Sequence, residues 1–438
     1  MSPLALGLVI CLVTVLVLAT GTPVAFALGI VAFGFIAVFD GWYGVMATAD
    51  TLFAGLEDFT LVSIPMFVMM GAAVASSRAG SDLYEALARW LHRLPGSLAV
   101  ANIGACALFA ALTGSSPATC AAIGKMGIPE MRRRGYDTGL ATGAIAAGGT
   151  LGILIPPSIT MILYGIASES SIGRLFLAGV MPGLMLTGLF AAWALFVSWR
   201  QGPLADAGRR YSLRERLAAL PRVLPFVVVI VGVVWALYGG VATPSEAAGV
   251  GAMLCLLLVA LVYQVWRWRD LWPIFRDTLK ESVMILMIIA TSILFGYMLA
   301  SLYVTQALAE WIAVLEVNRW VLLGWINLLL LVAGCFLPPA AIILMTTPIL
   351  LPIVTSAGFD PIWFGVMLTV NMELGLITPP VGLNLYVING IAPDVPLPTI
   401  LKGSLPFMLL MVLGMVLLCL FPGIATWLPD TLMGPALS

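Results

Sequence analysis

Polar side chains and helix-breaking residues interrupt the apolar stretches of this chain in two regions. In the first region they are Thr113, Gly114, Ser115, Ser116, Gly149, Thr150 and Gly152. In the second region they are Pro338, Pro339, Glu373, Gly375 and Thr378. Helix ends leave backbone carbonyls without partners, and carbonyl and hydroxyl oxygens are the ligands that hard cations prefer. We therefore predict two sites for a monovalent cation, with Na⁺ as the ion and no transition metal.

Three further polar residues lie just past the interruptions and are candidates for contact with a substrate. They are Ser158, Asn384 and Asn389. Backbone amides at the start of a helix favour a carboxylate, because their N–H groups and the helix dipole both attract negative charge. The pattern therefore predicts a cavity for a carboxylate beside the ion sites.

Two of these features also have a purely structural interpretation. The pair Gly148-Gly149 is equally typical of close helix packing inside a membrane. Glu373 is an acid inside an apolar stretch, where ionisable residues are usually functional, but a partner in the core could satisfy it. The occurrence of similar interruptions in two separate regions favours the functional interpretation.

The two regions belong to an internal repeat. Pro129, Gly135, Asp137, Gly152 and Pro156 recur 223 positions later as Pro352, Gly358, Asp360, Gly375 and Pro379. A constant spacing without gaps indicates two copies of one structural unit. We place the copies at residues 1–215 and 216–438.

The composition is that of a helical membrane protein that crosses the bilayer several times. Of the 438 residues, 61% are hydrophobic and 9% are charged, against about 25% charged in soluble domains. The net charge of −1 gives no reason to expect a nucleic-acid partner. The six cysteines are scattered and predict neither a disulfide set nor a metal site.

Each copy is predicted to contain five membrane crossings, one of them broken, and one re-entrant hairpin. In the first copy the crossings are 4–19, 24–39, 61–76, the broken helix 137–166, and 175–199, with a hairpin at 97–128. In the second they are 223–238, 244–266, 282–302, the broken helix 361–391, and 405–427, with a hairpin at 320–356. The segments 81–94 and 306–315 are predicted to be interfacial helices, and 40–60 a loop. The fold class is therefore all-α and polytopic.

The number of crossings and the distribution of charge predict that the two copies are inverted relative to each other. Five crossings are an odd number, so the second copy enters the membrane in the opposite sense. In this topology 18 of the 20 basic residues lie on one side and only Arg174 and Arg319 lie opposite. The positive-inside rule makes the basic side cytoplasmic, and both termini are then periplasmic. Inverted repeats with broken helices near the midplane are typical of secondary transporters.

Several of these motifs together resemble a known transporter family. The stretches are Gly114–Thr119, Pro129–Asp137 with its Arg132-Arg133-Arg134, Gly148–Pro157 and Leu374–Pro380. They are similar to the large membrane subunit of tripartite ATP-independent periplasmic (TRAP) transporters, the DctM-like family, over nearly the whole chain. The resemblance implies that the hairpin tips and helix breaks named above are the ion sites.

The resemblance also implies a setting and partners. It implies a Na⁺-coupled elevator-type importer in the bacterial inner membrane, surrounded by lipid. Its substrates would be organic acids, including C4-dicarboxylates and sialic acids. Its partners would be a periplasmic solute-binding protein and a small four-helix membrane subunit. Because the chain begins directly with the span at 4–19, we expect the small subunit to be a separate polypeptide.

Two other functions are alternatives to this one. A stand-alone carboxylate or ion exchanger of related inverted-repeat fold would work without a binding protein. An integral-membrane enzyme would need catalytic residues, but the chain has no HExxH, nucleophile elbow, Walker loop or Asp-rich diphosphate motif. We therefore expect a transporter rather than an enzyme, with no cofactor other than the coupling ion.

Overall fold

The computed structural model describes residues 2–94, 96–201, 211–314 and 317–434. In these residues the chain is helical throughout, and no strand is present. The first part contains α1 Pro3–Ala19, α2 Val24–Phe39, α3 Gly41–Leu56, η1 Phe59–Val62, α4 Ser63–Ala75, α5 Ala79–Leu91, α6 Ser97–Thr113, α7 Ser116–Arg133, α8 Thr138–Thr150, η2 Leu151–Ile153, α9 Ile159–Ala167 and α10 Ile172–Gln201.

The second part is also helical, and its long helix α14 stands where the first part has α3, η1 and α4. It contains α11 Leu213–Leu217, α12 Leu220–Tyr238, α13 Pro244–Tyr263, α14 Trp268–Ser301, α15 Val304–Val314, α16 Arg319–Gly334, α17 Pro339–Ser356, α18 Pro361–Leu376, α19 Leu383–Ile391, α20 Leu397–Leu420 and α21 Gly423–Met433. Residues 202–210 and position 315 of the predicted segment 306–315 lie outside the described residues.

Repeated residues form the same local structure in both parts. Gly135 follows α7 with φ +84°, and Gly358 follows α17 with φ +80°, a conformation that glycine adopts without steric cost. Two residues later an aspartate caps the next helix: Asp137 accepts from the backbone N–H of Leu140 at 2.9 Å, and Asp360 accepts from that of Trp363 at 2.7 Å. The 223-residue spacing thus corresponds to a repeated helix stop and helix start.

Both predicted breaks and both predicted hairpins are present as pairs of helices. The broken helices are α8–α9, interrupted at 151–158, and α18–α19, interrupted at 377–382. The hairpins are α6–α7 and α16–α17, and the predicted interfacial segments are α5 and α15.

Two predictions about the outer elements were wrong. The segment 40–60, predicted as a loop because of its acids, forms α3, in which Trp42, Tyr43 and Phe53 are exposed. The predicted last span 405–427 is two helices, because α20 ends at Leu420 and Pro422 precedes the separate helix α21. Acidic residues spaced along a helix do not prevent it from forming, whereas a proline at a helix end does help to separate two helices.

Fewer helices than the ten predicted crossings are long and apolar enough to span a membrane on their own. Among the described residues, six helices are long and apolar enough to cross a membrane: α10, α12, α13, α14, α17 and α20. A seventh span forms if α3 and η1–α4, which meet at a bend of 60°, are taken together. α1 and α2 have 17 and 16 residues and are short for a bilayer core of about 30 Å. No half of a broken helix is long enough to be counted, since α8, α9, α18 and α19 have 13, 9, 16 and 9 residues.

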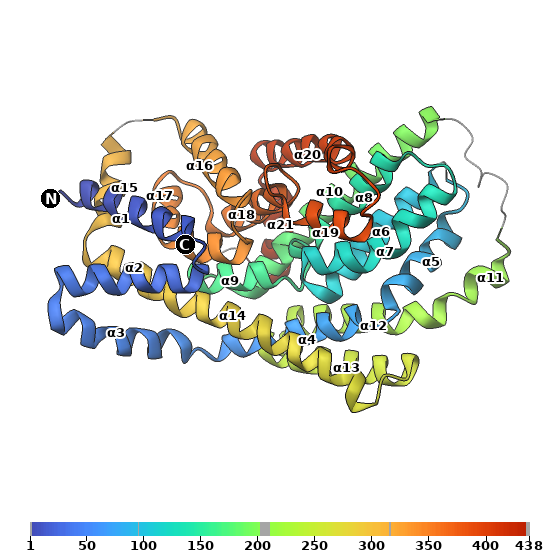
Figure 1. Ribbon diagram of the computed structural model, residues 1–438, viewed down its shortest axis with the longest axis horizontal. Coiled ribbons are helices and arrows are strands. Elements are labelled where there is room, and N and C mark those ends of the chain that lie inside the picture. Colours follow the sequence, from blue (N-terminus) through green and yellow to red (C-terminus); the bar gives the residue numbers. More distant parts are fainter. Residues whose placement is uncertain (1, 95, 202–210, 315–316, 435–438) are drawn as a thin grey trace.

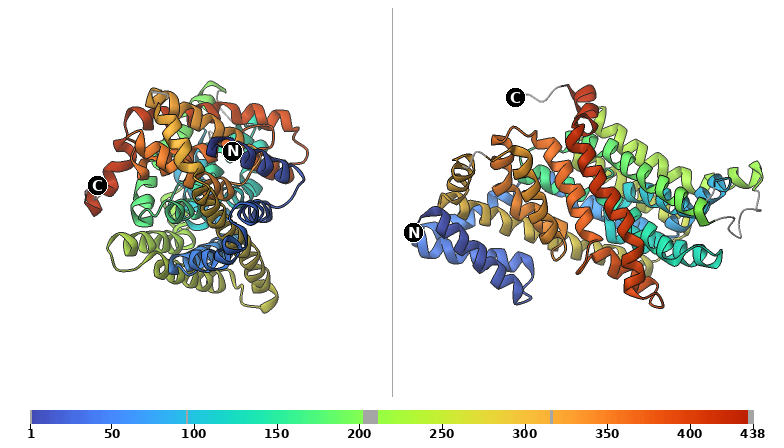
Figure 2. Two further views of the ribbon diagram at one scale, coloured as in Figure 1. Left: turned by 90° about the vertical axis from the view of Figure 1, so that its left-hand side faces the viewer. Right: turned by 90° about the horizontal axis from the view of Figure 1, so that it is seen from above.

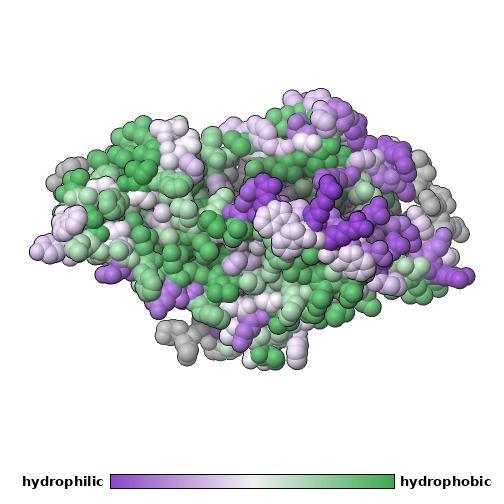
Figure 3. Space-filling model, turned by 60° about the horizontal axis from the view of Figure 1, so that its bottom comes forward, coloured by the Kyte–Doolittle hydropathy of each residue, from purple (hydrophilic) through white to green (hydrophobic). Residues whose placement is uncertain are grey.

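The packing between the two parts is reciprocal. α2 packs against α14 and α13 against α4; α7 packs against α19 and α17 against α9. Figure 1 shows the long helix α14 running beside α2, α3 and α4, and the right-hand view of Figure 2 shows α20 and α21 together crossing the width of the molecule. Figure 3 shows a mostly apolar face whose hydrophilic residues gather toward the side on which α5 and α11 lie in Figure 1.

Glycine permits a close contact between helices α8 and α20. A Cβ atom at Gly403 would lie 2.0 Å from the Gly139 carbonyl oxygen, and one at Gly143 would lie 2.1 Å from the Gly403 carbonyl oxygen. The two backbones therefore touch directly, as small residues allow in membrane helix pairs.

Candidate functional site

The first hairpin tip is a tight turn between α6 and α7. α6 ends at Thr113, Gly114 has φ +57°, Ser115 is extended, and Ser116 begins α7. Gly114 permits the left-handed turn, and a Cβ there would lie 3.0 Å from the Pro157 carbonyl oxygen in the first helix break. The tip therefore meets the break at its backbone.

Hydroxyl and carbonyl oxygens gather at this tip. Thr119 Oγ1 lies 2.9 Å from Thr113 Oγ1 and donates to the Ser115 carbonyl at 2.8 Å. Gly152 in the break approaches the same carbonyl, since a Cβ at Gly152 would be 2.7 Å from it. Thr113 and Thr119 are 3% and 0% exposed, so this oxygen-rich cluster lies inside the protein rather than at its surface. Such a set of neutral oxygens suits a hard cation.

A residue from the other half of the chain reaches the same tip. Asn384, the second residue of α19, donates from Nδ2 to Ser116 Oγ at 2.7 Å and, at 3.4 Å, to the Ala146 carbonyl of α8. Asn384 and Ser116 are both completely buried. The structure thus brings together a predicted ion-site residue and a predicted substrate residue that are 268 positions apart.

The same two helices are joined again at their other end. Arg132 Nη2 near the end of α7 lies 2.6 Å from Asp394 Oδ2, which follows α19. This hydrogen bond from Arg132 lowers the pKa of the Asp394 carboxyl. Between the two polar links, a Cβ at Gly124 would contact Ile391 at 3.2 Å. α7 and α19 are therefore held together along their length.

The second tip is built differently. The turn between α16 and α17 consists of Cys335, Phe336, Leu337 and Pro338, none of which carries a hydroxyl, and Phe336 is 61% exposed. Gly375 approaches the end of α16 so closely that a Cβ would lie 2.8 Å from the Gly334 carbonyl carbon. The tip and break of the second half therefore also meet, but through glycine backbone.

Glu373 is the charged residue of this second region. It is 0% exposed, and neither carboxyl oxygen has a hydrogen-bond partner among the described residues. On the other side of α18, Asn371 donates to the carbonyl and to Oδ1 of Asn327 on α16, each at 2.9 Å. Burying an unpaired carboxylate costs several kcal/mol, so an enclosed Glu373 calls for a proton or a cation.

Some side chains of the predicted sites already form hydrogen bonds with nearby backbone groups. Thr150 Oγ1 donates to the Ala147 carbonyl at 2.6 Å, and Thr378 Oγ1 to the Leu374 carbonyl at 2.6 Å. Ser158 caps α9 by accepting from the Met161 N–H at 3.2 Å and donates to the Ile153 carbonyl at 2.5 Å. Asn389 lies toward the far end of α19, where it donates at 3.5 Å to the Val395 carbonyl. Asn384 and Asn389 are therefore at opposite ends of α19.

The sequence prediction omitted two groups that belong to the first cluster. Thr119 lies one helical turn after Ser115, a spacing that places the two on the same face of α7 and could have indicated the contact. The Pro157 carbonyl offers no such signal, because backbone oxygens are the same at every position. Among the described residues no cluster of three or more His, Cys, Asp or Glu side chains could hold a metal.

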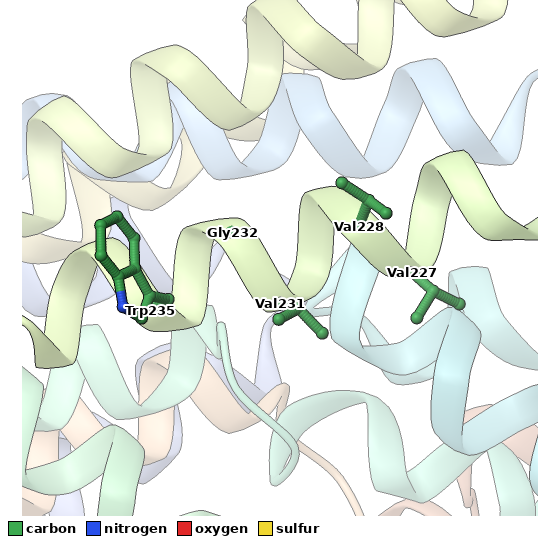
Figure 4. Close-up of a pocket in the computed structure, with 5 residues that line it drawn as sticks. All are labelled: Val227, Val228, Val231, Gly232 and Trp235. Carbon is green, nitrogen blue, oxygen red and sulfur yellow. The ribbon is translucent and has the colours of Figure 1, made fainter.

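The surface also carries a hollow of about 350 Å³ on α12. Figure 4 shows its lining by Val227, Val228, Val231, Gly232 and Trp235, all from this one helix. Aliphatic side chains and an indole offer no oxygen ligands, so this hollow fits neither an ion nor a carboxylate.

Comparison with known proteins decides the family. Residues 10–424 match the model of the DctM component of tripartite ATP-independent periplasmic transporters. The chain belongs to this family. It is a TRAP transporter large permease, and the resemblance inferred from its motifs is confirmed.

Relatives of this permease carry different substrate names. The C4-dicarboxylate TRAP transporter large permease DctM of Pseudomonas aeruginosa is 38% identical, with 89% of this chain and 90% of the relative covered. The sialic acid permease SiaM of Vibrio cholerae is 32% identical, covering 94% and 96%. The ectoine permease TeaC of Halomonas elongata is 32% identical, covering 91% and 92%.

Solved transporter structures share the fold of the permease. The YdaH transporter of Alcanivorax borkumensis aligns with a TM-score of 0.62 at 16% identity, covering 95% of this chain and 99% of that one. MtrF of Neisseria gonorrhoeae aligns with a TM-score of 0.51 at 13% identity, covering 89% and 85%. At these identities the likeness concerns the fold alone.

Proposed function

We propose that this permease imports an organic acid by Na⁺-coupled secondary transport. A periplasmic binding protein delivers the substrate, and a separate small four-helix subunit completes the membrane unit. The observation that carries the proposal is the buried oxygen cluster where the first tip meets the first break. Neutral oxygens supply a Na⁺ shell, and the bound ion supplies a positive charge that attracts a carboxylate substrate.

The proposed ion sites are the residues predicted from the sequence. Thr113, Gly114, Ser115, Ser116, Gly149, Thr150 and Gly152 surround the first, and Pro338, Pro339, Glu373, Gly375 and Thr378 the second. Ser158, Asn384 and Asn389 line the proposed substrate path. The second site differs from the first in relying on the formal charge of Glu373, because its tip lacks hydroxyl side chains.

Inverted repeats and an elevator movement are proposed for the transport cycle. The two repeats, 1–215 and 216–438, have opposite orientations in the bacterial inner membrane, with both termini periplasmic. The reciprocal packing of the two halves supports a pseudo-twofold relationship. The hairpins and broken helices move together, and the double link between α7 and α19 supports their movement as one body.

The substrate class follows from charge and from the relatives. Relatives named for C4-dicarboxylates and sialic acid both handle carboxylates, which supports an organic acid. The relative named for ectoine widens the range to a zwitterion that still carries a carboxylate.

Reconstitution tests the proposal. The permease, its small subunit and its binding protein are combined in proteoliposomes, and uptake of labelled four-carbon dicarboxylate and sialic acid is measured with Na⁺ or choline outside. Uptake of one substrate that requires Na⁺ and the binding protein is expected. Equal uptake in choline argues against Na⁺ coupling, and uptake by the permease alone favours a stand-alone exchanger.

A further inference from the structure

The carboxamide of Asn384 has one end bonded and the other end free. Its Nδ2 donates to Ser116 Oγ and to the Ala146 carbonyl. A backbone carbonyl can only accept, so this contact fixes which end of the amide is nitrogen. The other end, Oδ1, is buried and has no hydrogen-bond partner among the described residues. A buried acceptor left unpaired in this way is free to bind an ordered water or an ion.

The free oxygen belongs to a carboxamide whose nitrogen contacts the first tip. Oδ1 shares a carbon with Nδ2, and Nδ2 is 2.7 Å from Ser116 Oγ. Ser116 in turn follows Ser115, whose carbonyl is bound by Thr119 Oγ1. Buried amide, carbonyl and hydroxyl oxygens are therefore available around the start of α7, and all of them are neutral ligands for a hard cation.

We propose that Asn384 Oδ1 is a ligand of the cation at the first hairpin tip, so that the ion binds the first hairpin to the second broken helix. This inference rests on the proposed Na⁺ coupling. It assigns to Asn384 a role at the ion site, whereas its position after the helix break predicts contact with substrate. Asn384 then contacts both the cation and the substrate, and a bound cation holds the start of α19 in place.

The geometry of α19 explains why such a link matters. The far end of α19 is already tied to α7 by the Arg132–Asp394 ion pair at 2.6 Å. Without the ion, the Asn384 end has one hydrogen bond to the hairpin and one longer contact to α8. A bound cation adds a bond at this end, and α19 is then held firmly at both ends, beside the proposed substrate cavity. A ligand that binds one arrangement better shifts the population toward it.

The two tips differ in this respect. With the 223-residue spacing, the position that matches Asn384 is Met161, which has no carboxamide. The position that matches Ser116 is Pro339 at the start of α17, which has no hydroxyl. The link between an ion site and the opposite half is therefore a property of the first tip.

Thermal unfolding of the purified permease with its small subunit tests the inference. Unfolding is followed as choline is replaced by Na⁺ at constant ionic strength, for wild type, Asn384→Ala, Asn384→Asp and Tyr386→Ala. Loss of a ligand is expected to raise the Na⁺ concentration for half-maximal stabilisation by at least about tenfold in Asn384→Ala. Asn384→Asp keeps an oxygen at the site but loses the donor to Ser116, so its Na⁺ response is expected to be retained.

Tyr386→Ala is the matched control, because it removes an exposed side chain from the same helix, α19. An unchanged response in this variant and a weakened one in Asn384→Ala support the inference. If Asn384→Ala responds to Na⁺ like wild type, Asn384 is not a ligand, while Na⁺ coupling itself stands. If wild type shows no Na⁺ response, the proposed coupling fails and the inference with it. Should Asn384→Ala not fold, Asn384→Asp tests the inference instead: a carboxylate oxygen at the ion should lower the Na⁺ concentration for half-maximal stabilisation, and an unchanged concentration overturns the inference.

Discussion

Arg132 Nη2 lies 2.6 Å from Asp394 Oδ2, across 262 positions of the chain. The pair joins the cytoplasmic end predicted for the first hairpin to the segment that follows the second broken helix. It therefore connects the two halves of the permease at a point well away from the ion cluster, and both partners are partly exposed, with 37% and 60% of their side chains accessible.

We expect this pair to make stability depend on pH at the acid end. The hydrogen bond from Arg132 lowers the pKa of Asp394 in the folded protein. A carboxyl with a lowered folded pKa contributes stability above its unfolded pKa of about 3.9 and loses it as pH falls through the folded value. Asp394→Asn should therefore have a lower unfolding temperature than wild type at neutral pH. At low pH the two proteins should unfold at the same temperature. Equal unfolding temperatures at pH 7 in low salt would contradict this expectation.

The contact between α8 and α20 predicts a strong effect of a small substitution. A Cβ at Gly403 would lie 2.0 Å from the Gly139 carbonyl oxygen, and backbone cannot move aside as a flexible side chain can. Gly403→Ala should destabilise the permease by about 1–3 kcal/mol or more, measured by thermal unfolding in detergent. Gly249→Ala in α13 is the control, because nothing lies within 4 Å of its Cβ. There the helix should gain up to about 1 kcal/mol.

Substitution of Glu373 is expected to reduce transport without impairing folding. Glutamine has the same shape but no charge to attract a cation, and it removes the cost of a buried unpaired carboxylate. Glu373→Gln should fold at least as well as wild type in choline, yet its Na⁺-driven uptake should fall by an order of magnitude or more. Uptake in proteoliposomes and unfolding in choline measure the two effects on one preparation. Wild-type uptake by the variant would remove Glu373 from the proposed second ion site.

Arg174 is predicted to stabilise the C-terminal helix. Arg174 Nη2 lies 2.5 Å from Asp430 Oδ1, and Nη1 donates to the Gly434 carbonyl at 2.8 Å. Arg174→Ala should cost roughly 1 kcal/mol, since the pair is partly exposed. Asp430→Asn should cost less, because Arg174 keeps its hydrogen bond to the Gly434 carbonyl, and the double variant should cost little more than Arg174→Ala. A double variant with the sum of both losses would show that Arg174 and Asp430 act independently.

Repeat spacing predicted much of the fold. Proline, glycine and aspartate restrict backbone geometry locally, so Gly135-Tyr136-Asp137 and Gly358-Phe359-Asp360 indicate a helix stop and start without any knowledge of the rest. The hairpins and both broken helices follow from such residues. The loop predicted at 40–60 was wrong because its acids say nothing about backbone geometry, and the apolar residues between them support the helix α3.

The sequence by itself determined that this chain is a helical membrane protein with two related halves and polar breaks, because apolar content and backbone-restricting residues act locally. The tertiary structure decided which distant groups meet. Asn384 reaches Ser116, and Gly152 approaches the Ser115 carbonyl, only because α7, α8 and α19 pack side by side. Contacts of this kind depend on how helices pack, and every backbone carbonyl looks alike in a sequence.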